Sequence, residues 1–134
     1  IEASRNSVLQ FMTMLERARM LCLLKSGNKN DGLLTKPEKI YLGNTNLAYA
    51  LVENTPETGM LRETFFINQL GVKHNVKYPR SGDFLVNDTY TFEVGGKGKG
   101  HDQIKSEPNA YVAMDGVEYG FKNKIPLWMF GLLY

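Results

Sequence analysis

The sequence predicts an α/β domain built from helices and strands. Apolar residues recur at intervals of three and four from residue 7 to 24 and again from 55 to 71, which is the period of amphipathic helices. Between residues 72 and 94 the interval falls to two, as in strands. The 134 residues, 43% of them hydrophobic, suffice for one core but are few for two independent domains.

The first expected element is an amphipathic helix from residue 7 to 24, with Ser4 as its N-cap. Its apolar stripe consists of Val8, Phe11, Met12, Leu15, Ala18 and Leu21. Glycine and turn-forming residues in the segment 25–32 should end the helix. Because the helix begins close to Ile1 and the chain has no initial Met, we expect the sequence to be a piece of a longer protein.

Two helices and a strand are expected in the middle of the chain. Residues 39–44 have the pattern of a short strand, and 45–53 that of a short helix capped by Thr45 or Asn44. The next helix is closed by Gly71. Its apolar stripe consists of Leu61, Phe65, Phe66 and Leu70.

Strands dominate the rest of the chain. Alternation predicts a strand in 72–80 and a hairpin in 82–94. A short helix is expected in 101–106 and a further strand in 109–120. Pro126 is suited to the first turn of a final helix.

Two loop lengths compete in the hairpin. A two-residue turn at 87–88 would mix polar and apolar side chains on both faces, whereas a three-residue loop at 87–89 gathers one apolar face. The longer loop gives the pairs Phe84–Phe92 and Val86–Tyr90. Because a slip of one residue would turn this apolar set away from the core, we expect the three-residue register.

In that register Asp83 lies directly opposite Glu93, and opposed like charges destabilise a strand pair. A divalent cation or a basic side chain is needed to compensate. Mg²⁺ suits two carboxylates plus water, and such a site can generate hydroxide for phosphodiester cleavage. The alternative is that both acids lie at a wet sheet edge beside lysines. These residues alone leave both interpretations open.

Composition excludes several classes of protein. The net charge of +2 permits a nucleic acid partner without requiring one. The single Cys22 excludes an intrachain disulfide and a cysteine zinc cluster, so we expect a reducing, cytoplasmic setting. The longest apolar run, 125–134, is half of the ~20 residues that a membrane-spanning helix needs, so no membrane partner is expected.

The glycine and lysine run at 95–100 is not a nucleotide-binding loop, because it lacks the spacing GxxxxGK[ST] and also GxGxxG. As a basic loop that exposes its backbone it could contact phosphates, or it could be a solvated loop.

Four phrases resemble the C-terminal domain of a bacterial and archaeal family of AAA-type ATPases: KIYLGNTNLAYAL, GMLRETFFINQL, GDFLVNDTYTFEVGGK and NKIPLWMFGLLY. The order of features is similar to the PD-(D/E)xK nuclease superfamily. The resemblance implies a winged-helix remnant or linker helix in residues 1–34 and, in 35–134, a restriction-endonuclease-like α/β domain with a mixed sheet flanked by helices. An N-terminal ATPase domain would precede them and bind ATP in the parent protein.

The resemblance also implies a Mg²⁺ site. Carried over by position, Glu63 matches the helical acid, Asp83 the first strand acid, and Glu93 the acid of the Glu-x-Lys element, all three as metal ligands. The superfamily's lysine position holds Gly95 here, and Lys97 is the nearest substitute as a catalytic residue. On a regular strand the Cα of Lys97 would lie ~13 Å from that of Glu93 instead of ~7 Å, so the glycines would have to bulge or fold back.

Five further residues are candidates around this site. Gln103 and Lys105 follow it at a distance where the superfamily often places accessory polar residues. Arg17 and Arg19 would contact DNA phosphates if the first helix acts as a winged-helix recognition helix, and Lys99 is a further nucleic acid contact.

Glu63 lies between apolar helix positions, so we expect it to be partly buried and to have a partner. The candidate partners are Arg62, Arg80, Lys97 and a metal ion.

Two functions follow as hypotheses. The first is Mg²⁺-dependent DNA cleavage, or DNA binding by a nuclease-derived module, under the control of an ATPase. The second is a catalytically silent interaction or oligomerisation module that regulates the ATPase. Three converging carboxylates with Lys97 turned toward them would favour the first.

Overall fold

The computed structural model describes residues 4–27, 32 and 34–133. In chain order the elements are α1 (Arg5–Arg17), β1 (Leu21–Leu24), β2 (Lys39–Leu42), α2 (Thr45–Leu51), α3 (Thr58–Leu70), β3 (Val76–Lys77), β4 (Phe84–Val86), β5 (Tyr90–Gly95), the 3₁₀ helix η1 (Asp102–Ile104), β6 (Ala110–Met114), β7 (Lys124–Pro126) and the 3₁₀ helix η2 (Leu127–Leu132). The fold is mixed α/β, as predicted. Within the described ranges, no helix has the length and apolar character that a membrane span requires.

The predicted first helix is wrong at its C-terminal end. Ser4 caps it as expected, but α1 ends at Arg17 and the apolar run 21–24 forms strand β1. The chain reverses at Arg19, which has a left-handed φ of 57°. This turn lies so close to Gly43 that a Cβ there would be 1.8 Å from the Arg19 carbonyl oxygen. A short apolar run has no period of its own that separates strand from helix.

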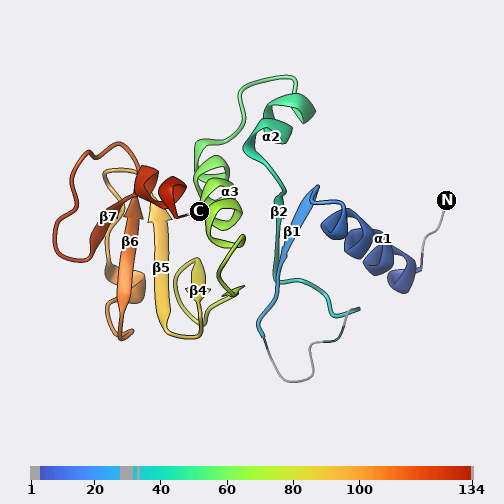
Figure 1. The fold of residues 1–134 in the computed structure, drawn as a ribbon, viewed down its shortest axis with the longest axis horizontal. Coiled ribbons are helices and arrows are strands. Elements are labelled where there is room, and N and C mark those ends of the chain that lie inside the picture. The colour runs from blue at the N-terminus through green and yellow to red at the C-terminus, as the bar shows by residue number, and fades with distance from the viewer. Residues whose placement is uncertain (1–3, 28–31, 33, 134) are drawn as a thin grey trace.

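Strands β1 and β2 form an antiparallel hairpin of their own, with Leu21 opposite Leu42 and Leu24 opposite Lys39. The hairpin spans the expected boundary at 34/35, because β1 precedes it and β2 follows it. In Figure 1, α3 stands between this hairpin and the larger sheet, and α1 lies on the far side of the hairpin.

The larger sheet has five strands in the order β3-β4-β5-β6-β7. Its first three strands are antiparallel, and β5, β6 and β7 run parallel. The three-residue hairpin loop is confirmed, because the register pairs Phe84 with Phe92 and Val86 with Tyr90. Asn87 and Asp88 take left-handed φ values of 52° and 55° in that loop. The strand predicted in 72–80 is reduced to the two residues of β3.

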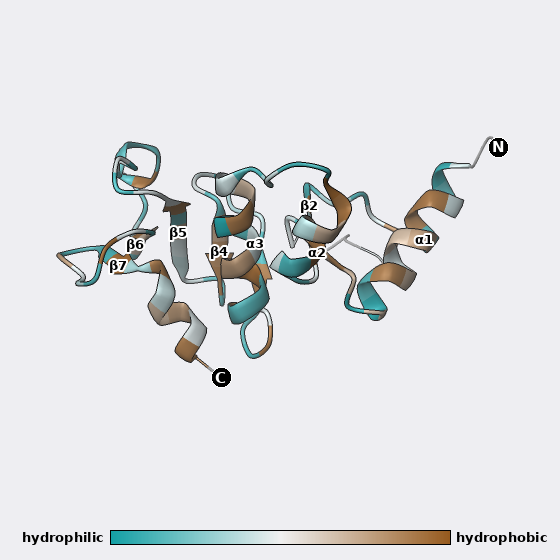
Figure 2. Cartoon of the chain, turned by 90° about the horizontal axis from the view of Figure 1, so that it is seen from above, coloured by the Kyte–Doolittle hydropathy of each residue, from teal (hydrophilic) through white to brown (hydrophobic). Residues whose placement is uncertain are grey.

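The core lies between α3 and one face of the sheet. Phe66 is fully buried, and its ring centroid lies 5.0 Å from Phe84, 5.1 Å from Phe92 and 4.9 Å from Phe130. Figure 2 shows strongly hydrophobic residues of α3 and β4 beside each other. This packing fixes α3 against the sheet, and with it the position of Glu63 one turn earlier.

A smaller cluster, built from Ile104, Val112 and Met114, covers the opposite face of the sheet under η1. Phe92 and Val94 belong to the α3-facing core. Side chains alternate along a strand, so Glu93 between them points to the η1 face.

Candidate functional site

Strand β2 presents two side chains to α3. Lys39 and Tyr41 are two residues apart on the strand and therefore share a face. The Tyr41 hydroxyl donates a 2.6 Å hydrogen bond to Glu63 Oε2, and the Lys39 ammonium lies 3.2 Å from the same oxygen. Glu63 thus has two partners, both from the hairpin.

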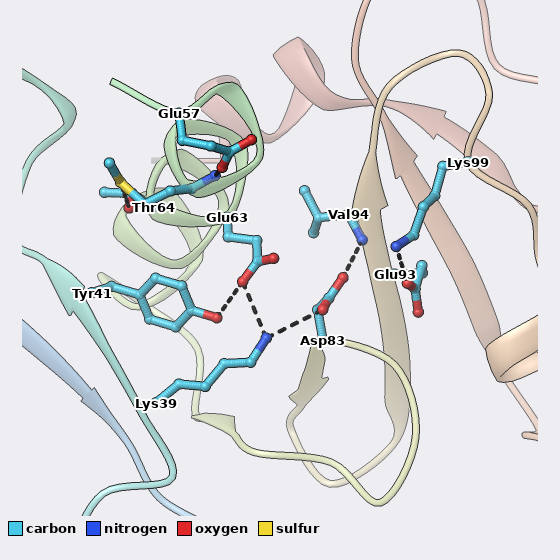
Figure 3. Close-up of polar contacts among 10 residues, drawn as sticks. Lys39, Tyr41, Glu57, Glu63, Thr64, Asp83, Glu93, Val94 and Lys99 are labelled. Atoms are coloured by element: carbon cyan, nitrogen blue, oxygen red, sulfur yellow. Dashed lines mark hydrogen bonds and ion pairs between the residues drawn. The ribbon is translucent and has the colours of Figure 1, made fainter. Parts of the chain in front are cut away.

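Asp83 lies next to this group, immediately before β4. The Lys39 ammonium is 3.3 Å from Asp83 Oδ1, while the Val94 N–H donates to Asp83 Oδ2 at 2.9 Å. Figure 3 shows the ammonium between the two carboxylates. Since it is 3.2 Å from one oxygen and 3.3 Å from the other, Glu63 Oε2 and Asp83 Oδ1 are at most about 6.5 Å apart.

Glu93 forms a second group with Lys99. The Glu93 side chain is only 1% exposed, and the Lys99 ammonium is 2.5 Å from its Oε1. With its amide nitrogen turned toward Glu93, which satisfies both ends of the amide, Gln103 donates to Oε1 at 2.9 Å and to Oε2 at 3.2 Å. The buried charge is therefore held by one cation and one amide.

Lys99 reaches Glu93 because the chain turns back after β5. The Lys99 N–H donates to the Gly96 carbonyl at 2.9 Å, closing a tight turn. A Cβ on Gly95 would lie 2.7 to 2.9 Å from the Lys99 side-chain carbons. Lys99 therefore fills the space that a side chain at position 95 would occupy, two residues after Glu93.

Lys97 lies elsewhere. Its side chain packs over Gly116, where a Cβ would be 3.2 Å from the Lys97 Cε. The chain turns back at Gly96, but the lysine that this turn brings to Glu93 is Lys99. The prediction that Lys97 lies beside Glu93 is wrong, because the turn at Gly96 places Lys99 there.

The three predicted acids form a row and do not converge on one point. From left to right in Figure 3 they are Glu63, Asp83 and Glu93, with Lys39 between the first two and Lys99 above the third. Within the described part of the chain, no three His, Cys, Asp or Glu side chains are grouped closely enough to hold a metal ion. Glu63 and Asp83 share one cation, whereas Glu93 is paired with Lys99, which also interacts electrostatically with Asp83 and Glu63.

The accessory and nucleic acid candidates differ in whether they contact the site. Gln103 contacts the site through Glu93, whereas the side chain of Lys105 is exposed on the same segment. Arg17 is exposed in the last turn of α1, and Arg19 is exposed in the turn that follows the helix.

Sequence reasoning missed Lys39 and Tyr41. None of the basic residues expected beside Glu63 is its partner in the structure: Arg62 instead pairs with Asp115, with 2.8 Å between Nε and Oδ2. The only local signal was the alternation in β2, which puts Lys39 and Tyr41 on one face without indicating what that face contacts.

The basic and phenolic groups of the site have raised pKa values. Burial lowers the pKa of Lys39, but the Glu63 and Asp83 carboxylates outweigh it and the net shift is upward. The hydrogen bond to Glu93 raises the pKa of Lys99. Burial is the main cause of the raised pKa of Tyr41, and the Glu63 carboxylate adds to it. Both ammonium groups are therefore charged at neutral pH.

These shifts predict a loss of stability in alkali. Ordinary Tyr and Lys side chains release their protons near pH 10.0 and 10.5, whereas folded Tyr41, Lys39 and Lys99 retain theirs to higher pH. The unfolded chain then binds fewer protons at these three groups, so their contribution to the free energy of unfolding is constant below about pH 10 and falls above it. Urea unfolding from pH 8 to 11 measures this.

Tyr41→Phe should make the fall shallower, because it removes one of these protons. Tyr119→Phe is the matched control at a phenol that is 83% exposed, and it should leave the pH slope as in the wild type. An equal slope in all three proteins would contradict the assignment to Tyr41.

Comparison with known proteins yields no relative. No protein-family model, no curated protein and no solved structure matches the chain.

Proposed function

We propose that the chain is a nuclease-like domain that cleaves DNA with the help of Mg²⁺ bound between Glu63 and Asp83. The observation that carries this proposal is the Lys39 ammonium held between these two carboxylates. Two acids from different elements that hold a cation between them, beside a buried Glu–Lys pair, support metal-assisted phosphodiester cleavage as the chemistry of this site.

The residues present fit Mg²⁺. This ion prefers carboxylate oxygens and water, and it is often bound by only one or two carboxylates. Glu63 and Asp83 supply two, and their exposed fractions of 24% and 14% leave room for water. When bound, the cation would polarise the phosphodiester and lower the pKa of a bound water. Glu93, which sequence resemblance assigned as a third ligand, acts in this proposal on Lys99 instead.

Hydrogen bonds to the neighbouring groups keep both acids in place. The Val94 N–H holds one oxygen of Asp83, which leaves Oδ1 for a cation. The Tyr41 hydroxyl holds Glu63. Because a raised pKa keeps Lys99 protonated, it serves to orient water or to neutralise charge on the phosphate, and it does not serve as a base.

The wider setting follows from the resemblance of the sequence. Residues 1–34, with α1 and β1, would belong to a winged-helix remnant or linker helix, and residues 35–134, with β2 and the five-stranded sheet, to a restriction-endonuclease-like domain. DNA would be the substrate, an N-terminal ATPase domain of the same protein the partner, and the cytoplasm the location. Oligomers of the parent protein are compatible with this arrangement.

One observation favours the second function, a catalytically silent interaction module. Each of the three acids already has a lysine counter-ion: Lys39 serves Glu63 and Asp83, and Lys99 serves Glu93. If the three acids only formed ion pairs that stabilise the fold, the same contacts would be present in a domain that binds no metal. Only a cleavage assay separates the two functions.

The test is cleavage of supercoiled and single-stranded DNA by the full chain with Mg²⁺, with Mn²⁺ and with EDTA. Lys99→Met should lower the metal-dependent rate by about a hundredfold, the usual effect of removing one charge-stabilising group. Lys97→Met is the matched control two residues away and should cleave at the wild-type rate. Equal cleavage rates for Lys99→Met and Lys97→Met would contradict the role assigned to Lys99. If the wild type shows no metal-dependent cleavage, the nuclease proposal is wrong and the catalytically silent interaction module is the function that stands.

A further inference from the structure

Lys39 occupies the place that the proposed function gives to a metal ion. Its ammonium is bound to Glu63 Oε2 and to Asp83 Oδ1 at nearly equal distances, 3.2 and 3.3 Å. It comes from β2, in the hairpin, whereas the two acids come from α3 and from the residue immediately before β4. The contact therefore joins the hairpin to α3 and to the larger sheet.

We propose that Lys39 is a built-in competitor for the divalent cation: its ammonium closes the site, and the cation binds only when the ammonium leaves. This inference rests on the proposed function, because it assumes that Glu63 and Asp83 are the metal ligands. It adds a regulatory step, since the residue that must leave belongs to the β1–β2 hairpin.

Occupation by the ammonium and by the metal is mutually exclusive. A Mg²⁺ ion held by Glu63 and Asp83 would need the same carboxylate oxygens that the ammonium now contacts. A monovalent and a divalent cation a few ångström apart also repel each other strongly in a partly buried site. Coordination of both acids therefore requires Lys39 to turn away.

The structure gives Lys39 a way out. Its side chain is 34% exposed, and its flexible four-carbon stem allows the ammonium to reach water without moving the strand. The acids would not follow it, because Tyr41 still donates to Glu63 and the Val94 N–H still donates to Asp83. Departure of one side chain thus leaves two neighbouring carboxylates without their counter-ion.

The expected gain in metal affinity depends on the fraction of molecules in which the Lys39 ammonium occupies the site. The apparent affinity of a ligand is reduced by the fraction of molecules that are competent to bind it. If the ammonium occupies the site in nine molecules of ten, metal affinity is reduced about tenfold. Removing the ammonium should therefore raise the metal affinity about tenfold.

The experiment measures Mn²⁺ binding to the full chain by titration calorimetry, with the bound ion followed by electron paramagnetic resonance. Lys39→Met should bind Mn²⁺ about tenfold more tightly than the wild type. Lys77→Met is the matched control, because it removes one lysine charge from an ion pair with the exposed Asp88. It should bind Mn²⁺ as the wild type does.

Lys39→Arg tests the same idea without loss of charge. The guanidinium can bind both carboxylates at once, so this variant should bind Mn²⁺ several-fold more weakly than the wild type. Because its ion pairs are retained, it guards against the outcome in which Lys39→Met fails to fold. Opposite effects of the two substitutions would support competition.

Asp83→Asn separates this inference from the proposed function. If Asp83→Asn loses Mn²⁺ binding while the Lys39 variants bind like the wild type, the competitor role is overturned and the metal site stands. If Mn²⁺ binding survives Asp83→Asn unchanged, or if neither the wild type nor Lys39→Met binds Mn²⁺, both are overturned. Tighter binding by Lys39→Met that depends on Asp83 supports both.

Discussion

Asp83→Asn is expected to lower metal-dependent DNA cleavage by about a thousandfold or more, while the fold is retained. Asparagine keeps an oxygen that can accept the Val94 N–H, so the start of β4 stays in place. It loses the negative charge that faces Lys39 and that would bind the cation. A thousandfold loss corresponds to about 4 kcal/mol of transition-state stabilisation, which is reasonable for removal of a metal ligand.

The measurement compares single-turnover cleavage rates of the wild type and Asp83→Asn at saturating Mg²⁺. Asp88→Asn is the matched control, because its carboxylate lies five residues away in the hairpin loop, is 61% exposed and is paired with Lys77. It should leave the rate unchanged. Equal cleavage by Asp83→Asn and the wild type would exclude Asp83 as a ligand and would trace the activity to another site or to a contaminant.

The hairpin was predictable because side chains 84 to 92 carry enough information to choose a register. Only the three-residue loop gathers Phe84, Phe92 and Val86 on one face, and burial of that face makes the alternative costly. The same reasoning failed at residues 21–24. There every side chain is apolar, so no alternation exists, and pairing with β2 decides the structure.

The lysine that pairs with Glu93 was not predictable from the sequence. Counting along an extended strand places Lys97 nearer to Glu93 than Lys99. The structure reverses this order because the chain turns at Gly96 and lays Lys99 over Gly95. Two consecutive glycines indicated a turn, whereas the direction of that turn depends on tertiary contacts.

The partners of Glu63 depend on contacts between distant parts of the chain. Lys39 is 24 residues from Glu63 and 44 residues from Asp83. Local patterns show which side chains share a face of β2, but only the packing of the hairpin against α3 brings that face to the acids. For this reason the sequence predicted a partly buried Glu63 and the wrong cation beside it.

Phe66→Ala is expected to lower the free energy of unfolding by about 3–5 kcal/mol, the usual cost of truncating a fully buried aromatic side chain. The ring is inaccessible to solvent and contacts three other rings, from β4, β5 and η2. Truncation would remove the contact of each neighbouring ring with the Phe66 ring. Because a well-packed interior collapses only partly around a cavity, these contacts would not be fully replaced. Urea denaturation followed by circular dichroism measures the loss.

Phe11→Ala is the matched control, because the same truncation removes a side chain of α1 that is 59% exposed. It should change the free energy of unfolding by about 0.5 kcal/mol or less. Similar losses for both variants would show that Phe66 is not the centre of the core. The contrast also concerns the site, since Phe66 lies one turn after Glu63 on α3. A cavity at this point would loosen the helix that holds one of the two acids beside Lys39, so metal binding should weaken in Phe66→Ala even where the chain remains folded.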